Sequence, residues 1–169
     1  WLQVLGFDGE APLTHDGRSL PLARWLGEAR ELTRLARPFL ARHAALGRHA
    51  ELNRLLAPEQ VVALAKLLRE RQPIDLLRDH PAPWTPEELV ASLRPLAPRL
   101  YSIASSQRVV GEEAHLTVAR LESEYQGLRR GGAASEFLAT RSSEGDAVPV
   151  WLERNERFHL PADDSRDLI

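Results

Sequence analysis

The stretch PRLYSIASS, residues 98–106, marks the point at which the pattern of the chain changes. Upstream of it, prolines separate short segments whose apolar residues recur at helical spacing. Downstream of it, apolar and polar residues alternate in residues 100–105 and 115–121, which is typical of half-buried strands. The sequence therefore predicts a mixed α+β fold, helical to about residue 95 and β-rich from residue 96 onwards.

Local signals predict individual elements. Asp16–Gly17 indicates a turn, and Ser19 is a candidate cap for the helix after it. Apolar residues recur at helical spacing from Leu32 to Leu40, which predicts another helix. The run Thr85–Glu88 predicts a capping box, in which the Thr85 hydroxyl accepts from the backbone and Glu88 reaches back to it. Alternation at 148–152 predicts a further strand, and the final apolar pair, residues 168–169, could begin another.

The composition narrows the classes of function. The chain of 169 residues has a formal net charge of −2, which gives no bulk attraction to nucleic acid. It has no apolar run of about 20 residues, so we expect no membrane-spanning segment. It has no cysteine, which excludes disulfides and thiol nucleophiles and favours a reducing compartment, the cytoplasm. The six histidines do not show metal-ligand spacing, so we expect no metal site.

The residues Arg99, Tyr101 and Ser102 could together bind a flat, anionic ligand. An arginine fork suits a phosphate or pyrophosphate, and a tyrosine ring offers a surface on which an aromatic ligand can stack. A serine hydroxyl both donates and accepts, so it can address a ring nitrogen. The alternative is an ordinary strand with a surface arginine and a half-buried tyrosine.

A second candidate anion site lies in RGGAASEFLA, residues 130–139. A glycine pair leads directly into a predicted helix, and backbone donors at a helix start can bind phosphate where glycines permit close approach. The alternative is a flexible turn followed by an N-cap serine, Ser135. Taken together, a phosphate fork, a stacking ring and a phosphate-binding helix start match the needs of a dinucleotide with a flat redox ring.

Four stretches in this order and spacing carry a family resemblance: RPLAPRLYSIASSQ (94–107), HLTVA (115–119), GGAASEFLA (131–139) and WLERNERFHLP (151–161). With them, the chain resembles the diflavin reductases, the family that includes the flavoprotein subunit of NADPH-dependent sulfite reductase. The proline-rich helical region is similar to the connecting domain of that family. The resemblance thus covers nearly the whole chain.

The resemblance implies two domains. Residues 1–95 would be the all-α connecting domain, with the tail end of the preceding barrel segment. Residues 96–169 would be part of an antiparallel Greek-key β-barrel that binds FAD, cut before the NADP-binding domain. The sequence lacks an initiator methionine and ends on the apolar pair Leu168–Ile169, so we expect a fragment with an incomplete barrel. The flavodoxin-like FMN domain would lie further upstream.

The resemblance also implies site residues. Arg99 would bind the FAD pyrophosphate, Tyr101 would stack on the flavin ring, and Ser102 would take the catalytic position, hydrogen-bonded near the hydride-accepting nitrogen. The other implied cofactor-binding residues are Leu100 in the same motif, Thr117, Val118 and Ala119 along the ribityl and adenosine portion, and Gly132, Ala133, Ala134 and Ser135 at the pyrophosphate loop.

Two positions depart from the family pattern. Relatives often have glycine where this chain has Ala119, and a tyrosine where it has Ser123. Tyr125, two residues further on, is a candidate replacement on the adenine side.

The implied function is electron transfer from NADPH through FAD to FMN and on to an acceptor, for which sulfite reductase hemoprotein is the first expectation. NADPH and FMN would bind outside this chain. One alternative is a reductase that serves another heme or flavin acceptor. The other is a non-catalytic helical interaction module.

Overall fold

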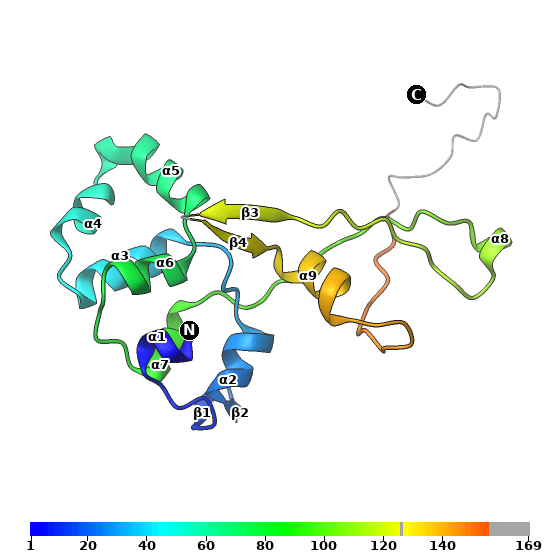
Figure 1. Cartoon of the computed structure of the whole chain (residues 1–169), viewed down its shortest axis with the longest axis horizontal. Helices are drawn as coiled ribbons and strands as arrows, with labels where there is room; N and C mark the ends of the chain where they lie inside the picture. The colour runs from blue at the N-terminus through cyan, green and yellow to red at the C-terminus, as the bar shows by residue number, and fades with distance from the viewer. Residues whose placement is uncertain (126, 156–169) are drawn as a thin grey trace.

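The computed structural model of the chain describes residues 1–125 and 127–155 and shows a helical lobe from which an extended C-terminal part projects (Figure 1). The helical lobe contains α1 (Leu2–Leu5), β1 (Pro12–His15), β2 (Arg18–Pro21), α2 (Leu22–Arg24), a π-helical turn (Trp25–Ala29), α3 (Arg37–Leu46), α4 (Ala50–Leu55), a 3₁₀ turn (Pro58–Gln60), α5 (Val61–Glu70), α6 (Pro73–Asp79) and α7 (Pro86–Ser92). The C-terminal part contains α8 (Gln107–Val110), β3 (Glu122–Tyr125), β4 (Leu128–Gly131), α9 (Ala133–Glu136) and a second π-helical turn (Phe137–Arg141). The predicted mixed fold is confirmed.

Local sequence signals set where two of the helices, α7 and α6, begin. Thr85 precedes Pro86 at the start of α7, and its hydroxyl oxygen accepts a hydrogen bond from the Glu88 backbone N–H at 3.2 Å. The expected reciprocal bond from Glu88 is replaced by an ion pair with Arg42 on α3. In α6, Gln72 and Asp75 form a complete capping box ahead of a buried helix.

The first hairpin corrects the expectation of an all-helical N-terminal part. Asp16 and Gly17 form the predicted turn, with φ values of 50° and 72°, the conformation that a two-residue hairpin loop requires. This turn joins β1 to β2 in an antiparallel pair. Ser19, predicted to cap a helix, lies in β2 opposite Thr14, and the helix starts only at Leu22. The geometry of the turn thus makes residues 18–21 a strand, although the apolar residues that follow Ser19 recur at helical spacing.

The hydrophobic core belongs to the helical lobe. Within the described residues, every buried apolar side chain lies between Leu13 and Leu93. At its centre Phe39, His43 and Trp84 form a stack, with 5.3 Å between the ring centroids of Phe39 and Trp84. The Trp84 indole N–H donates to His43 Nδ1 at 3.0 Å, so the buried histidine accepts at this nitrogen.

The second hairpin, β3–β4, extends from the C-terminal part and reaches the helical lobe with its turn end (Figure 1). The two strands pair in register from Glu122 opposite Gly131 to Tyr125 opposite Leu128. Arg130 of β4 then forms an ion pair with Asp75 of α6. This contact connects the hairpin to the lobe.

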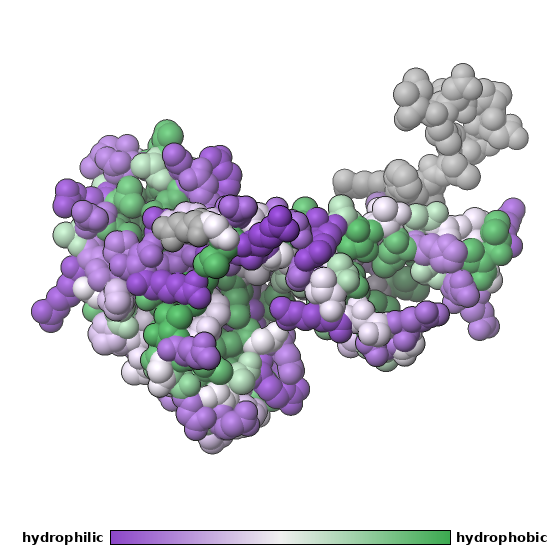
Figure 2. Space-filling view, in the orientation of Figure 1, coloured by the Kyte–Doolittle hydropathy of each residue, from purple (hydrophilic) through white to green (hydrophobic). Residues whose placement is uncertain are grey.

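The strands predicted for residues 100–105 and 115–121 are reduced to one antiparallel bridge, Ile103 to Leu116. No strand is assigned at 148–152, where alternation also predicted one. The physical reason is the lack of partners: exposed apolar side chains such as Leu100 and Val150 have no second layer against them in the described part of the chain. Figure 2 shows such hydrophobic residues on the surface of the projecting part.

The described residues contain two separate two-stranded antiparallel sheets and no closed barrel, so the Greek-key barrel of the prediction is not seen in them. Two sequence expectations lie outside the described residues: the end of the WLERNERFHLP motif and the strand expected at Leu168–Ile169.

Candidate functional site

The three predicted flavin-binding segments are neighbours in the structure. The Ala104 N–H donates to the His115 carbonyl at 2.8 Å, next to the Ile103–Leu116 bridge, which joins the PRLYSIASS and HLTVA segments. The Gly132 N–H donates to the Leu121 carbonyl at 2.9 Å, which joins the second segment to the glycine loop. Residues separated in the sequence are therefore brought next to each other by backbone contacts in the projecting part.

Arg99, the predicted pyrophosphate ligand, is already engaged within the protein. Its Nη2 donates to Glu31 Oε2 and its Nη1 to the Ala97 carbonyl, each at 2.6 Å. The arginine side chain retains 27% exposure, whereas that of Glu31 retains 6%. The guanidinium is thus held in one position while part of it still faces solvent.

The rest of the predicted ring-binding group is accessible. Tyr101 is half-buried, and Leu100 and Ser102 are exposed. Thr117 and Ala119 are exposed and Val118 is half-buried, in a segment without regular structure. In the described part of the chain nothing covers these side chains from a second layer, so their donors remain open to a ligand.

The glycine loop is held tightly by its own neighbours. A Cβ at Gly132 would lie 2.9 Å from Ser135 Oγ and 3.2 Å from Leu121 Cβ. The buried Ser135 hydroxyl accepts from the Leu121 N–H at 3.1 Å. The Gly132 N–H and the Ser135 hydroxyl oxygen are therefore both bonded to the Leu121 backbone. Donors left for a ligand include the Ser135 hydroxyl hydrogen and the amides of Ala133 and Ala134 in the first turn of α9.

Packing gives a simple prediction at this loop. Replacing Gly132 by alanine should lower the free energy of unfolding by roughly 1–2 kcal/mol, because the added methyl overpacks the contact with Ser135 and Leu121. Its φ of −71° suits alanine, so backbone strain does not contribute. Urea denaturation compared with Gly27→Ala, where a Cβ would meet nothing within 4 Å, measures the effect. Equal stability of the two variants would contradict it.

A charged cluster at the end of the second hairpin was not predicted from the sequence. The Arg130 guanidinium binds Asp75 with two nitrogens, and the longer of these bonds, from Nη1 to Oδ2, measures 2.6 Å. Two guanidinium groups lie near the Tyr125 ring, with Arg71 5.1 Å and Arg130 5.3 Å from its centroid. Tyr125 thus contacts the helical lobe, and its predicted adenine-side role remains a prediction.

A second ion pair flanks the glycine loop. Arg120 binds the Glu136 carboxylate with two nitrogens at 2.7 and 3.0 Å. The hydrogen bond from Arg120 holds the pKa of Glu136 below its usual range. The pair places an ionised carboxylate, balanced by Arg120, beside Gly131. The sequence motif contains Glu136 but does not show this pairing.

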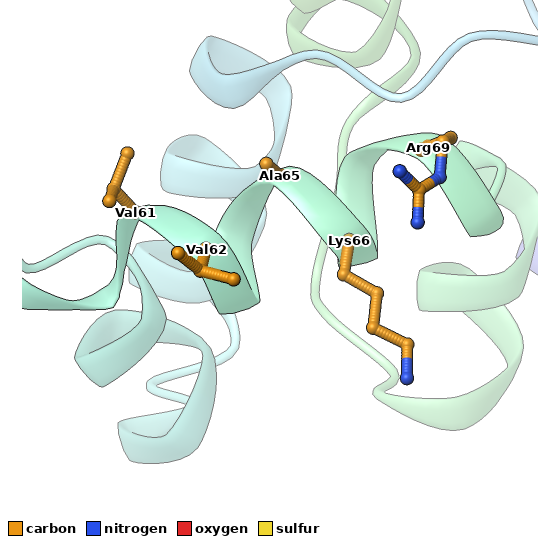
Figure 3. Close-up of a pocket in the computed structure, with 5 residues that line it drawn as sticks. All are labelled: Val61, Val62, Ala65, Lys66 and Arg69. Carbon is orange, nitrogen blue, oxygen red and sulfur yellow. The ribbon is translucent and has the colours of Figure 1, made fainter.

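The surface hollows lie elsewhere. One is a shallow depression on α5 lined by Val61, Val62, Ala65, Lys66 and Arg69 (Figure 3), and another lies between α3 and α7. Neither includes a predicted flavin-site residue. Within residues 1–125 and 127–155, no three His, Cys, Asp or Glu side chains are grouped to hold a metal ion. No helix in that same part is long and apolar enough to span a bilayer.

Comparison with curated proteins gives a match along almost all of the chain. It is 39% identical over 168 residues to the sulfite reductase (NADPH) flavoprotein alpha-component of Neisseria meningitidis serogroup B, with 99% of this chain and 28% of that protein covered. The proteins of the same name from Pectobacterium atrosepticum and Vibrio cholerae are each 40% identical, with 99% of this chain and 27% of each covered. The chain is homologous to a segment of these flavoproteins. The family resemblance inferred from the four motifs is confirmed.

The chain spans a little over a quarter of the length of the curated relatives it matches. No family model matches the chain. The relatives are, by name, NADPH-dependent flavoproteins that act as components of sulfite reductase. What this segment contributes must therefore be argued from its own residues.

Proposed function

We propose that this chain is an FAD-binding segment of an NADPH-dependent diflavin reductase. In the whole protein, electrons would pass from NADPH through FAD to FMN and on to sulfite reductase hemoprotein. The observation that carries the proposal is the full-chain homology to sulfite reductase flavoproteins, in which the motif residues of the predicted site are included. A reductase for another heme or flavin acceptor is the nearest alternative within the same class.

The chemistry of the donor set suits a flavin dinucleotide. Arg99 offers a partly exposed guanidinium, Ser102 an exposed hydroxyl, and Tyr101 a half-buried ring. If the antiparallel register of Ile103 and Leu116 continued, Ser102 would face Thr117 and Tyr101 would face Val118. This register would place residues 100–102 and 117–119 side by side, which supports the proposal that both segments contact the same cofactor.

Each residue has a role in the proposal. Arg99 and the α9 start, Gly132 to Ser135, would bind the pyrophosphate, while Leu100 and residues 117–119 would line the cofactor. Tyr101 would stack on the flavin ring, and Ser102 would donate or accept at the ring nitrogen that receives hydride. When bound, the flavin supplies the hydride acceptor and the single-electron donor, and the protein orients it.

The domain division and the partners are part of the same proposal. Residues 1–95 would form the connecting domain and residues 96–169 part of the FAD-binding barrel. The exposed apolar residues of 97–155 support this division, because such side chains require further strands to cover them. The FMN domain and the NADP-binding domain would be partners within the parent protein, and the cytoplasm its compartment.

A flavin titration tests the proposal. The fluorescence of FAD should be quenched saturably when FAD binds to the protein at its native length. FMN, which lacks the pyrophosphate and adenine, should bind this site much more weakly. Arg99→Ala should weaken FAD binding roughly tenfold to a hundredfold, because hydrogen bonds to charged groups contribute roughly 1.5–3 kcal/mol. The measurement is the dissociation constant from flavin fluorescence.

Arg108→Ala is the matched control, since Arg108 is an exposed arginine on α8, outside the predicted site. It should leave the FAD dissociation constant unchanged. A protein that binds neither flavin at the 97–135 site would contradict the proposal and favour the helical interaction module, whose core in residues 13–93 is already formed.

A further inference from the structure

The ion pair between Arg99 and Glu31 joins the predicted cofactor site to the helical lobe. The two residues are 68 positions apart in sequence, and Arg99 Nη2 donates to Glu31 Oε2 at 2.6 Å. The Ala97 carbonyl accepts from the other terminal nitrogen, Nη1. Both ends of the guanidinium fork are therefore fixed by protein acceptors.

Glu31 is itself held firmly. Its second carboxylate oxygen, Oε1, accepts from the Thr33 backbone N–H at 2.9 Å and from the Thr33 hydroxyl at 2.6 Å. Its backbone N–H donates to the Arg94 carbonyl at 2.9 Å, beside the bridge between Arg30 and Pro95. The carboxylate is thus anchored through one oxygen, and its backbone through Arg94, while the other oxygen faces Arg99.

Exposure decides which member of the pair a ligand would meet. The Glu31 side chain is 6% exposed and that of Arg99 is 27% exposed, so the anion lies on the buried side and the cation faces outward. A guanidinium has five N–H groups, and the bonds found in the described part of the chain use two of them. Up to three remain for an anionic ligand.

We propose that Glu31 is a positioning residue, which holds the Arg99 guanidinium ready for the pyrophosphate of the cofactor. This inference rests on the proposed function. A free arginine side chain loses rotamer freedom when it binds a phosphate, and a side chain that is already fixed loses less. The buried carboxylate therefore favours FAD binding by organising Arg99 beforehand, and it does not compete with the pyrophosphate for it.

Glu31→Gln tests this role because the amide cannot replace both functions of the carboxylate. One oxygen of Glu31 faces the Thr33 donors and the other faces Arg99, so the glutamine NH₂ must oppose a donor on one side. Fluorescence titration should give a dissociation constant for FAD about tenfold larger than in the wild type. Binding of FMN or riboflavin, which lack the pyrophosphate, should not change.

A double-mutant cycle separates positioning from general damage. In the Arg99→Ala background, Glu31→Gln should cause no further loss of FAD affinity, because its effect passes through the arginine. Glu31→Asp keeps the charge but is one methylene shorter, and it should weaken FAD binding like Glu31→Gln. This milder variant keeps the test valid if Glu31→Gln fails to fold, which circular dichroism reports.

The outcomes are distinct. Tighter or unchanged FAD binding in both Glu31 variants would overturn the positioning role, and so would equal weakening of FAD and FMN. Loss that persists in the Arg99→Ala background would overturn it as well. A wild-type protein that binds no FAD would overturn the proposed function and this inference together, whereas FAD binding that ignores Glu31 would overturn the inference alone.

Discussion

Replacing Arg130 by alanine should lower the free energy of unfolding of the helical lobe by about 3 kcal/mol, because Asp75 then stays buried without its cation. The Asp75 side chain is 4% exposed and that of Arg130 is 10% exposed, so solvent screens the pair little. Urea denaturation followed by the fluorescence of the buried Trp25 and Trp84 measures the change. Arg129→Ala, at the exposed neighbouring position, is the control and should have little effect.

The pH dependence gives this prediction a second test. Burial acts to raise the pKa of Asp75, but the hydrogen bonds from Arg130 and the Gln72 backbone outweigh it and hold the pKa below its usual range. The stability from the pair is therefore present above the unfolded carboxyl pKa of about 3.9 and is lost as the pH falls through the lower folded value. Without Arg130, burial raises the pKa of Asp75, and protonation of this carboxyl group then removes the free-energy cost of a buried, unpaired charge.

The stability difference between Arg130→Ala and the wild type should accordingly shrink as the pH falls from about 7 to about 4. A difference below about 1 kcal/mol at neutral pH would show that the hairpin detaches and lets water reach Asp75 at little cost. A double replacement of both members by leucine should recover much of the loss, because an apolar pair leaves no buried charge.

Acid should destabilise the helical lobe through His43 before its carboxylates titrate. Burial lowers the pKa of His43 to about 4, and the charges of His49 and His80 act in the same direction, while the nearby backbone of His80 and Leu76 acts against them. Its Nδ1 already accepts from Trp84, and its buried Nε2 has no hydrogen-bond partner in the described residues. The folded lobe therefore favours the neutral imidazole.

The direction of the effect follows from this. The pKa of His43 in the folded lobe lies below its unfolded value of about 6.5, so at higher pH the imidazole is neutral in both states and does not lower the free energy of unfolding. As the pH falls from about 6.5 to about 4, only the unfolded state takes up the proton, and stability is lost. Over that interval the free energy of unfolding should drop by about 3 kcal/mol, which thermal or urea denaturation at a series of pH values measures.

His43→Gln should remove most of this slope, because the amide oxygen can still accept from Trp84 but does not become charged. His115→Gln, at an exposed histidine, should leave the slope as it is. A wild-type stability that is flat between about pH 6.5 and 4 would mean that His43 protonates freely in the folded lobe.

The parts of the fold that sequence reasoning predicted are those set by local chemistry. The Thr85–Pro86 helix start and the Asp16–Gly17 turn depend on groups within three residues of each other, and both formed as expected. The helix predicted from Leu32 begins instead at Arg37, because Ala36 is extended and Pro38 occupies the first turn. Local signals thus fixed element types better than element starts.

Features that depend on distant partners were not predictable in the same way. Alternation at 100–105 indicated a strand, but a strand forms only where another backbone supplies its hydrogen bonds, and here one bridge does so. The pairs Asp75–Arg130 and Glu31–Arg99 join residues 55 and 68 positions apart, and nothing in their local sequence marks them. The candidate site residues came from the family motif, and the side chains that hold them came from the structure.

Among the described residues, the confinement of buried apolar side chains to positions 13–93 has a consequence for amide hydrogen exchange. Amides in α3, α6 and α7 should exchange only when the whole lobe unfolds, whereas those of residues 97–120 should exchange through local opening at almost the rate of a free peptide. Most of the proposed flavin contacts, from Arg99 to Ala119, then lie in a weakly protected segment of the described residues. A cofactor that binds this segment must order its backbone. Binding should therefore slow amide exchange in the residues from Arg99 to Leu121.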